Sequence, residues 1–291
     1  MQFTTQQLRG GGKYSVKAKI GNWYEDMVLD ETKFKEYISL KDWNGLLVSQ
    51  KEAKYAGMLA RVDLTPFSSG TLTTGHYFMF KNKKTNGFMV MDVDDRNPQY
   101  KAAFGCTTSP LMNFPCPRSL FKIEKYNDDK NLNSFPEPQP ESSVCYNDKI
   151  VIVAYPSAYD FPLYLFSPLV GPFAYSRFSR NQEVLFSSEE SFYNCWTIEH
   201  VDPIKRFEVM GQPVRVDQPF LIRHFQTGKL LGSDLIDYNN DYGHEFEMCA
   251  NNYLAITKFK RIEADKNPKY DRPDVSRIEK DVNIWCAVDK V

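Results

Sequence analysis

The sequence predicts an all-β fold built from three copies of one structural unit. Each copy opens on a short apolar run, passes through a turn into a second strand-like run, and closes on a strand with a large aromatic side chain. The openings are residues 77–80, 150–153 and 220–222, the second runs are 87–91, 161–166 and 228–233, and the closings are 120–123, 195–198 and 284–288. Such self-similarity indicates one supersecondary unit that is used several times. Three β units around a shared core predict a β-trefoil-like domain, which is mainly a scaffold for binding.

The repeats also set the boundaries of this domain. We place it at residues 71–291 and expect the closing aromatics Phe121, Trp196 and Trp285 to lie in its core. Two polar stretches that contain proline are predicted to be loop insertions between β elements, where loops are tolerated. They lie near residues 128–143 and 263–281.

Residues 1–70 are predicted to form an extended N-terminal arm with one short helix. Residues 14–29 read as extended, with a turn at 20–23. A helix capped by Asp30 follows, in which Phe34, Tyr37 and Ile38 make one apolar stripe because they fall three and four residues apart. Residues 43–45 end this helix, and residues 48–64 are predicted to be irregular or a strand.

Composition and charge exclude several classes of protein. The 291 residues are 42% hydrophobic, which is enough for a packed core, and the net charge is −1. A chain without excess positive charge is not expected to bind nucleic acid by bulk electrostatics. No apolar run is long enough to cross a membrane, and no secretory signal opens the chain. The six cysteines are scattered singly, which predicts free, mostly buried thiols and a cytoplasmic location.

No residue pattern points to catalysis, and we expect no enzyme activity, no metal and no cofactor. A zinc site at His244 and Cys249, or a nucleophile–base pair of Cys195 and His200, is conceivable, but structural roles are favoured because no metal-ligand spacing accompanies them. The acidic run at residues 92–95 lacks the glycine and the final glutamate of a calcium-binding loop and is predicted to be a solvated turn.

Two basic clusters, at residues 81–84 and 258–261, are candidates for contact with an acidic protein surface. The first falls on a predicted hairpin turn, where Lys83 and Lys84 are the candidate contact residues. A turn that is simply solvated is the alternative. A contact of this kind steers association more than it adds affinity.

Three collinear segments carry a family resemblance. Residues 20–31 contain Gly-Asn-Trp-Tyr-Glu-Asp and then an apolar-acidic stretch, which resembles the N-terminal signature of the cilia- and flagella-associated protein 161 family. Residues 194–196, 202–203 and 207–214 are similar to that family's central block. The C-terminal part of the family is matched by Ile222-x-His224-x-x-Thr227, by residues 243–245 and by the strand around Trp285. Residues 93–146 resemble the family least.

The resemblance implies a microtubule inner protein of ciliary doublet microtubules. Such a protein binds α/β-tubulin from the lumen of the A-tubule beside other microtubule inner proteins, and it belongs to the cytoskeleton of the ciliary axoneme. Trp23, Tyr24, Glu25 and Asp26 are then the expected anchors, since aromatic side chains dominate interface energies. In the alternative interpretation, Trp23 only fastens the arm to the β domain.

A cytosolic ligand- or carbohydrate-binding module is the competing function. Lectins of the ricin type carry Gln-x-Trp in their closing strands, whereas this chain has Asn194-Cys195-Trp196 and Asn283-Ile284-Trp285 there. The sequence therefore favours the structural role.

Overall fold

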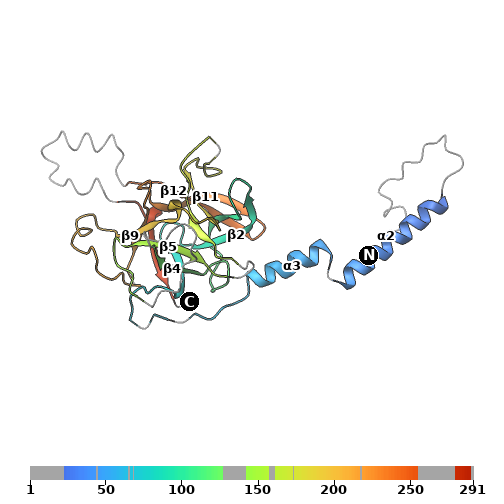
Figure 1. Ribbon diagram of the computed structural model, residues 1–291, viewed down its shortest axis with the longest axis horizontal. Coiled ribbons are helices and arrows are strands. Elements are labelled where there is room, and N and C mark those ends of the chain that lie inside the picture. The colour runs from blue at the N-terminus through green and yellow to red at the C-terminus, as the bar shows by residue number, and fades with distance from the viewer. Residues whose placement is uncertain are drawn as a thin grey trace. The chain divides into compact units, whose positions relative to one another are not determined.

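The computed structural model describes residues 23–43, 45–64, 66–67, 69–126, 142–156, 161–172, 174–216, 218–254 and 279–289. The chain divides into two compact units, Met1–Ala56 and Gly57–Val291 (Figure 1). No helix in these ranges is long and apolar enough to span a membrane.

Two helices occupy the region where one short helix was expected. Helix α2 (Trp23–Asp42) has 20 residues, and helix α3 (Leu47–Met58) has 12. The predictions of extended chain over 23–29 and of irregular or strand structure over 48–64 are therefore wrong for the helical residues. The physical reason is local composition, because both helices contain the helix-forming residues Leu, Met, Lys and Glu, α3 adds Ala, and neither helix contains proline.

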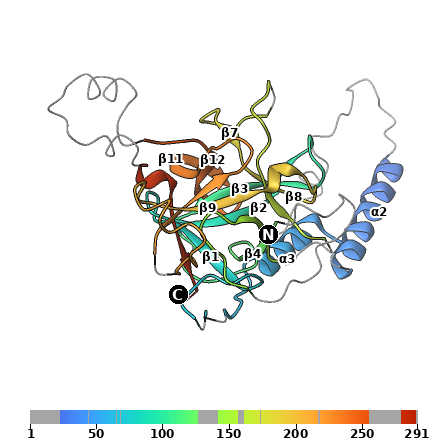
Figure 2. The same cartoon turned by 60° about the vertical axis from the view of Figure 1, so that its left-hand side comes forward.

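The second unit is built from antiparallel strands (Figures 1 and 2). The described part of the chain forms one 13-stranded sheet. The strands are β1 (Tyr77–Asn82), β2 (Phe88–Asn97), β3 (Ala103–Ser109), β4 (Phe121–Lys125), β5 (Lys149–Ala154), β6 (Tyr164–Phe166), β7 (Gln182–Glu183), β8 (Leu185–Ser187), β9 (Trp196–His200), β10 (Phe220–His224), β11 (Leu231–Asn240), β12 (Gly243–Ala250) and β13 (Ile284–Val288).

The sheet closes on itself, so the β-trefoil prediction is wrong. Pairing runs from β1 through β13, β10, β9, β5, β6, β8, β3 and β2 and returns to β1, which makes a closed antiparallel barrel of nine strands. Strand β4 pairs with β1 and β5, while β12 and β11 extend the sheet from β3. The prediction that this unit is all-β is confirmed.

The repeat pattern marks neighbouring strands of the barrel and not three lobes. The opening strands β1, β5 and β10 pair with the closing strands β4, β9 and β13. Strands β3 and β8, which complete the ring, lie outside the repeated signal. Every residue of β3 is buried, and its sequence Ala-Phe-Gly-Cys-Thr-Thr-Ser lacks apolar alternation. The closure was therefore not visible in the hydrophobic pattern.

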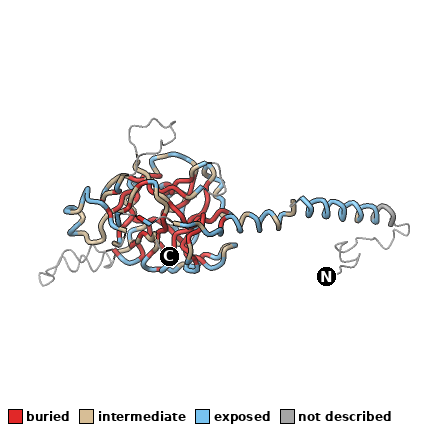
Figure 3. The backbone as a smooth tube through the Cα atoms, turned by 90° about the horizontal axis from the view of Figure 1, so that it is seen from below, coloured by how far each residue is buried: buried red, intermediate tan, exposed pale blue. Residues whose placement is uncertain are grey.

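The closing aromatics lie in the core as expected. Phe121, Trp196 and Trp285 are each fully buried. The indole Nε1 of Trp196 donates to Leu165 O at 2.8 Å, and that of Trp285 donates to Leu231 O at 3.0 Å. Figure 3 shows the buried residues concentrated in the β unit, whereas the described parts of α2 and α3 are mostly exposed.

A buried asparagine precedes the last closing strand. Asn283 Nδ2 donates to Asn251 O at 2.8 Å, and its Oδ1 accepts from Tyr253 N at 2.8 Å. A Cβ atom at Gly232 would lie 2.7 Å from Asn283 Nδ2, so a larger residue at this point of β11 would require Asn283 to shift. The predicted insertions at 128–143 and 263–281 lie almost wholly outside the described residues.

Candidate functional site: exposed helices and fastened polar networks

The two helices carry many exposed large apolar side chains. Phe34, Tyr37 and Ile38, the predicted stripe of α2, are 59%, 50% and 41% exposed. Trp43, just after α2, is 88% exposed, and Leu47 at the start of α3 is 78% exposed. Monomeric proteins rarely leave large apolar patches uncovered unless these bind something. The helices are therefore the first candidate surface for a partner.

The predicted anchors of the arm lie in the first turn of α2. Trp23, Tyr24, Glu25 and Asp26 are helical, so the aromatic pair belongs to a helix and not to an extended arm. Their side chains lie outside the described part of the structure, and their role as anchors stays a prediction.

The basic turn is placed as predicted. Lys83 and Lys84 lie between β1 and β2 and are exposed. Lys83 Nζ lies 3.0 Å from Asp281 Oδ1, and both side chains are about half exposed. Surface pairs of this kind contribute little, so Lys83 remains accessible to an acidic partner. That contact stays a prediction.

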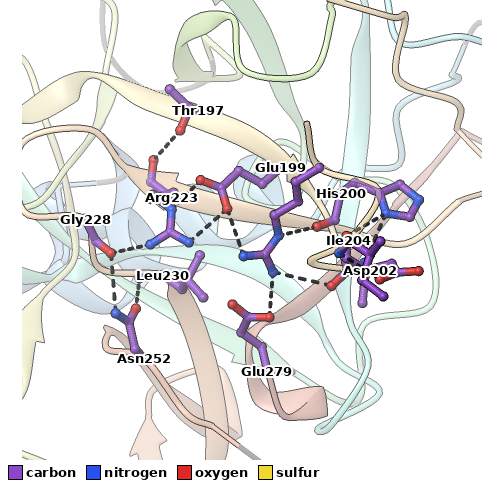
Figure 4. A network of polar contacts seen from close by, with 12 residues as sticks. Thr197, Glu199, His200, Asp202, Ile204, Arg223, Gly228, Leu230, Asn252 and Glu279 are labelled. Atoms are coloured by element: carbon purple, nitrogen blue, oxygen red, sulfur yellow. Dashed lines mark hydrogen bonds and ion pairs between the residues drawn. The ribbon is translucent and has the colours of Figure 1, made fainter. Parts of the chain in front are cut away.

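Two arginines hold residues 199–228 in place through hydrogen bonds and ion pairs (Figure 4). Arg223 on β10 donates hydrogen bonds to both carboxylate oxygens of Glu199 on β9, and its Nη1 donates to Gly228 O at 2.6 Å. Arg206 donates from Nε to His200 O at 2.8 Å and pairs through Nη2 with Glu279 Oε2 at 2.6 Å. Bidentate arginine–carboxylate pairs fix geometry as well as charge.

The segment that Arg206 fastens presents an exposed apolar ridge. Ile204, Phe207 and Met210 are 60%, 84% and 50% exposed. The backbone beneath them is held by Val209 N, which donates to Lys205 O at 3.0 Å. This 204–210 ridge is a second candidate contact surface, and unlike the helices it stands on the β unit.

His224, part of the resemblance motif, is a structural residue. Its Nε2 lies 3.1 Å from Tyr193 O, a carbonyl that only accepts, so the proton is on Nε2. Its Nδ1 then accepts from Thr227 Oγ1 at 2.8 Å and from Gln182 Nε2 at 3.2 Å. Burial lowers the pKa of His224 to about 4, which keeps the ring neutral. The spacing His-x-x-Thr thus encodes a hydrogen bond in the core.

A second buried network surrounds one ion pair. Arg118 Nη1 lies 2.8 Å from Glu245 Oε1, and both side chains are 1% exposed. The guanidinium stacks 3.6 Å from the ring centre of Tyr242, and Glu245 Oε2 accepts from Thr107 Oγ1 and Asn240 Nδ2, both at 2.6 Å. These polar groups are engaged with one another inside the protein.

The conceivable chemical sites take structural roles. His244 Nε2 lies 3.4 Å from Asp237 Oδ1, whereas Cys249 Sγ lies 3.6 Å from Tyr253 OH. Burial raises the pKa of the Cys249 thiol, which makes it unreactive. Nδ1 of His200 accepts from Asp202 N at 3.0 Å. Across the described residues, no three metal-binding side chains are grouped together.

The prediction that the acidic run at residues 92–95 is a solvated turn is wrong. It lies within strand β2, and Asp92 is 2% exposed, so it is not a solvated turn. The strand register shifts between Asp92 and Arg96, and Asp92 Oδ1 accepts from Asp94 N at 3.0 Å. An irregularity in a strand explains why a run of turn-forming residues was misread.

The prediction of free cysteines is confirmed.

Comparisons with known proteins confirm the resemblance. Residues 170–268 match the cilia- and flagella-associated protein 161-like domain. Cilia- and flagella-associated protein 161 of Danio rerio is 26% identical over 272 residues, which cover 87% of this chain and 86% of that protein. The Bos taurus protein is 24% identical over 290 residues, covering 94% and 82%. The crystal structure of the SDF2-like protein from Arabidopsis thaliana is 17% identical with a TM-score of 0.50, covering 76% of this chain and 96% of that one, and shows similarity of fold alone.

Proposed function

The chain is similar to cilia- and flagella-associated protein 161 over most of its length, and from this likeness we propose that it is a structural microtubule inner protein. The similarity supports association with cilia or flagella. We propose further that the protein binds α/β-tubulin in the lumen of axonemal doublet microtubules, beside other inner proteins, and that it stabilises the doublet. In this role it has no enzyme activity and uses no cofactor.

The exposure of large apolar side chains on α2 and α3 carries the proposal. Phe34, Tyr37 and Trp43 offer rigid aromatic area, the kind of side chain that dominates binding energy at interfaces. A protein held in a microtubule wall has such surfaces covered by its neighbours. The fastened 204–210 ridge adds a second surface that is already ordered, so its binding loses less conformational entropy.

Extraction of axonemes tests the location. A tagged full chain is expressed in ciliated cells, and the cilia are treated first with detergent and then with increasing salt. A lumenal protein stays with the doublets after both treatments, and chemical cross-links join it to α- or β-tubulin. Release into the detergent extract, or cross-links to non-tubulin proteins alone, contradicts the proposal.

Matched helix variants test the surface. Phe34→Ala, Tyr37→Ala and Trp43→Ala together remove exposed aromatic area, whereas Lys33→Ala, Lys35→Ala and Lys41→Ala remove an equal number of exposed basic side chains. The aromatic triple variant is expected to leave the doublets at lower salt than the lysine triple variant. Both should keep the melting temperature of the β unit, because all six side chains are exposed. Equal retention of the two variants would show that the aromatic side chains of the helices do not contribute to binding.

A further inference from the structure

A polar cleft lies in the β unit, and none of the residues that line it belongs to α2, α3 or the 204–210 ridge. It has a volume of about 450 Å³, within the range of small-molecule sites. The cleft lies where β2, β3, β7, β11 and β12 meet, and the turn at residues 175–177 forms part of its wall. Of the residues that line it, Cys106 and Met248 are buried, whereas Tyr175 and Arg177 are exposed.

The charged groups of the cleft are mostly paired with one another. Arg177 Nη2 lies 3.3 Å from Asp95 Oδ1, and Arg177 Nη1 donates to Tyr238 OH at 3.0 Å, while Tyr238 OH donates to Asp95 Oδ2. Both oxygens of Glu247 accept backbone N–H groups, from Phe178 at 2.7 Å and from Ser179 at 2.9 Å.

Glu183 is the exception. Within the part of the chain that the structure describes, its carboxylate accepts side-chain hydrogen bonds from Asn97 Nδ2 alone, at 3.3 Å and 3.4 Å, and no cation lies within salt-bridge distance. Burial is the main cause that raises the pKa of Glu183 to about 7, and the charge of Asp95 adds to it. The charge of Arg177 and the Asn97 hydrogen bond lower this pKa only in part, so a half-buried carboxylate remains in the cleft whose charge a ligand cation would balance.

We propose that this cleft binds an organic cation, whose guanidinium or ammonium group pairs with the Glu183 carboxylate. Of the two arginines of the lining, Arg177 is paired with Asp95, and Arg96 lies over the ring of Phe104. The lining holds three carboxylates against two guanidiniums, an excess of negative charge that favours a cation. The site does not rest on the proposed microtubule role.

The proposal carries a dependence on pH. Below about pH 7 the Glu183 carboxyl holds a proton that a cation must displace, so affinity falls roughly tenfold for each further unit of acidity. Burial raises the pKa of Tyr238 and Cys106 too, which keeps both neutral. The other charged groups that line the cleft are Asp95, Arg96, Arg177 and Glu247.

Calorimetric titration of the full chain at pH 8 tests the site. The probes are agmatine, acetyl-Gly-Arg-Gly-amide and the same peptide with neutral citrulline in place of arginine. Agmatine or the arginine peptide should bind, and the citrulline peptide should bind at least tenfold more weakly. Tighter binding of agmatine identifies a small free cation as the ligand, whereas tighter binding of the peptide identifies a basic side chain of a protein segment.

Two variants of equal charge change complete the test. Glu183→Gln keeps the shape of the side chain and should weaken binding at least tenfold, whereas Glu189→Gln, an exposed position nearby in sequence, should leave it unchanged. Affinity of the unaltered chain should be lower at pH 6 than at pH 8. Absence of saturable binding at 10 mM of either cationic probe, equal binding of the citrulline peptide, or binding that survives Glu183→Gln overturns the proposal. Retention in axonemes is unaffected by any of these results, so the two proposals fail separately.

Discussion

The neutral ring of His224 makes a defined prediction about acid stability. The folded protein holds the pKa of His224 near 4, whereas an unfolded chain titrates near 6.5. Between these values the unfolded state binds the extra proton, so stability falls as pH falls from about 6.5 to 4 and is fully present above 6.5. A shift of about 2.5 units corresponds to about 3 kcal/mol, at roughly 1.4 kcal/mol per unit.

The variant His224→Gln isolates this contribution. A glutamine amide can still donate to Tyr193 O but does not titrate, so the variant should be less stable at pH 7.5 and lose less on acidification. Urea unfolding at pH 7.5, 6, 5 and 4 gives the unfolding free energy of each protein, with intrinsic tryptophan fluorescence as the probe, to which the fully buried Trp196 and Trp285 contribute. The difference in unfolding free energy between the wild type and His224→Gln should decrease by about 3 kcal/mol from pH 7.5 to pH 4. Glu183, whose raised pKa acts with the opposite sign, is common to both proteins and cancels. A constant difference at all four values would refute the reasoning, as would an NMR titration of His224 near pH 6.5.

Three further predictions concern the core of the β unit. Trp285→Ala removes a fully buried side chain and should cost about 3–5 kcal/mol of unfolding free energy in urea titration, and a loss below about 1 kcal/mol would show that the closing strand is not part of the core. Arg118→Met leaves Glu245 as a buried unpaired charge and should cost about 3–5 kcal/mol, of which a second change, Glu245→Gln, should recover at least about 1 kcal/mol; no recovery would argue against an ion pair. Gly232→Ala places a Cβ 2.7 Å from Asn283 Nδ2 and should lower the melting temperature by several degrees, whereas an unchanged value would show that this contact adjusts freely.

The sequence located the strands that carry a continuous apolar signal. The closing strand at Ile284–Val288 was predicted with its observed bounds, and the buried aromatics were identified. The closure of the barrel was not predictable in this way, because β3 is buried on both faces and contains Gly105, Thr107 and Thr108 where an alternating pattern would have been recognised. Helix α3 was missed because its apolar residues are spread around the helix, so no stripe accompanied its favourable composition.

The functional surfaces were only partly accessible to sequence reasoning. The basic turn at Lys83 was placed correctly because a hairpin turn has a local signature. The role of His224 was not, although the motif was noted, because its meaning lies in contacts with Gln182 and Tyr193 far away in the sequence. The cleft was invisible for the same reason, since Glu183 and Asp95 come from strands that meet only after the barrel closes.

The pairing of β1 with β13 ties the folding of the β unit to the synthesis of residues 284–288. Asn82 on β1 lies opposite Trp285 on β13, and Phe67 N donates to Asp289 Oδ2 at 2.9 Å. On the ribosome, β2 and β4 can pair with β1 early, but its stretch Met79–Asn82 must wait for about two hundred further residues before β13 emerges. Until then it presents an unpaired strand edge, which is a template for aggregation. A nascent chain stalled before Ile284 should consequently engage chaperones strongly, and chaperone binding should fall once β13 has emerged and paired with β1.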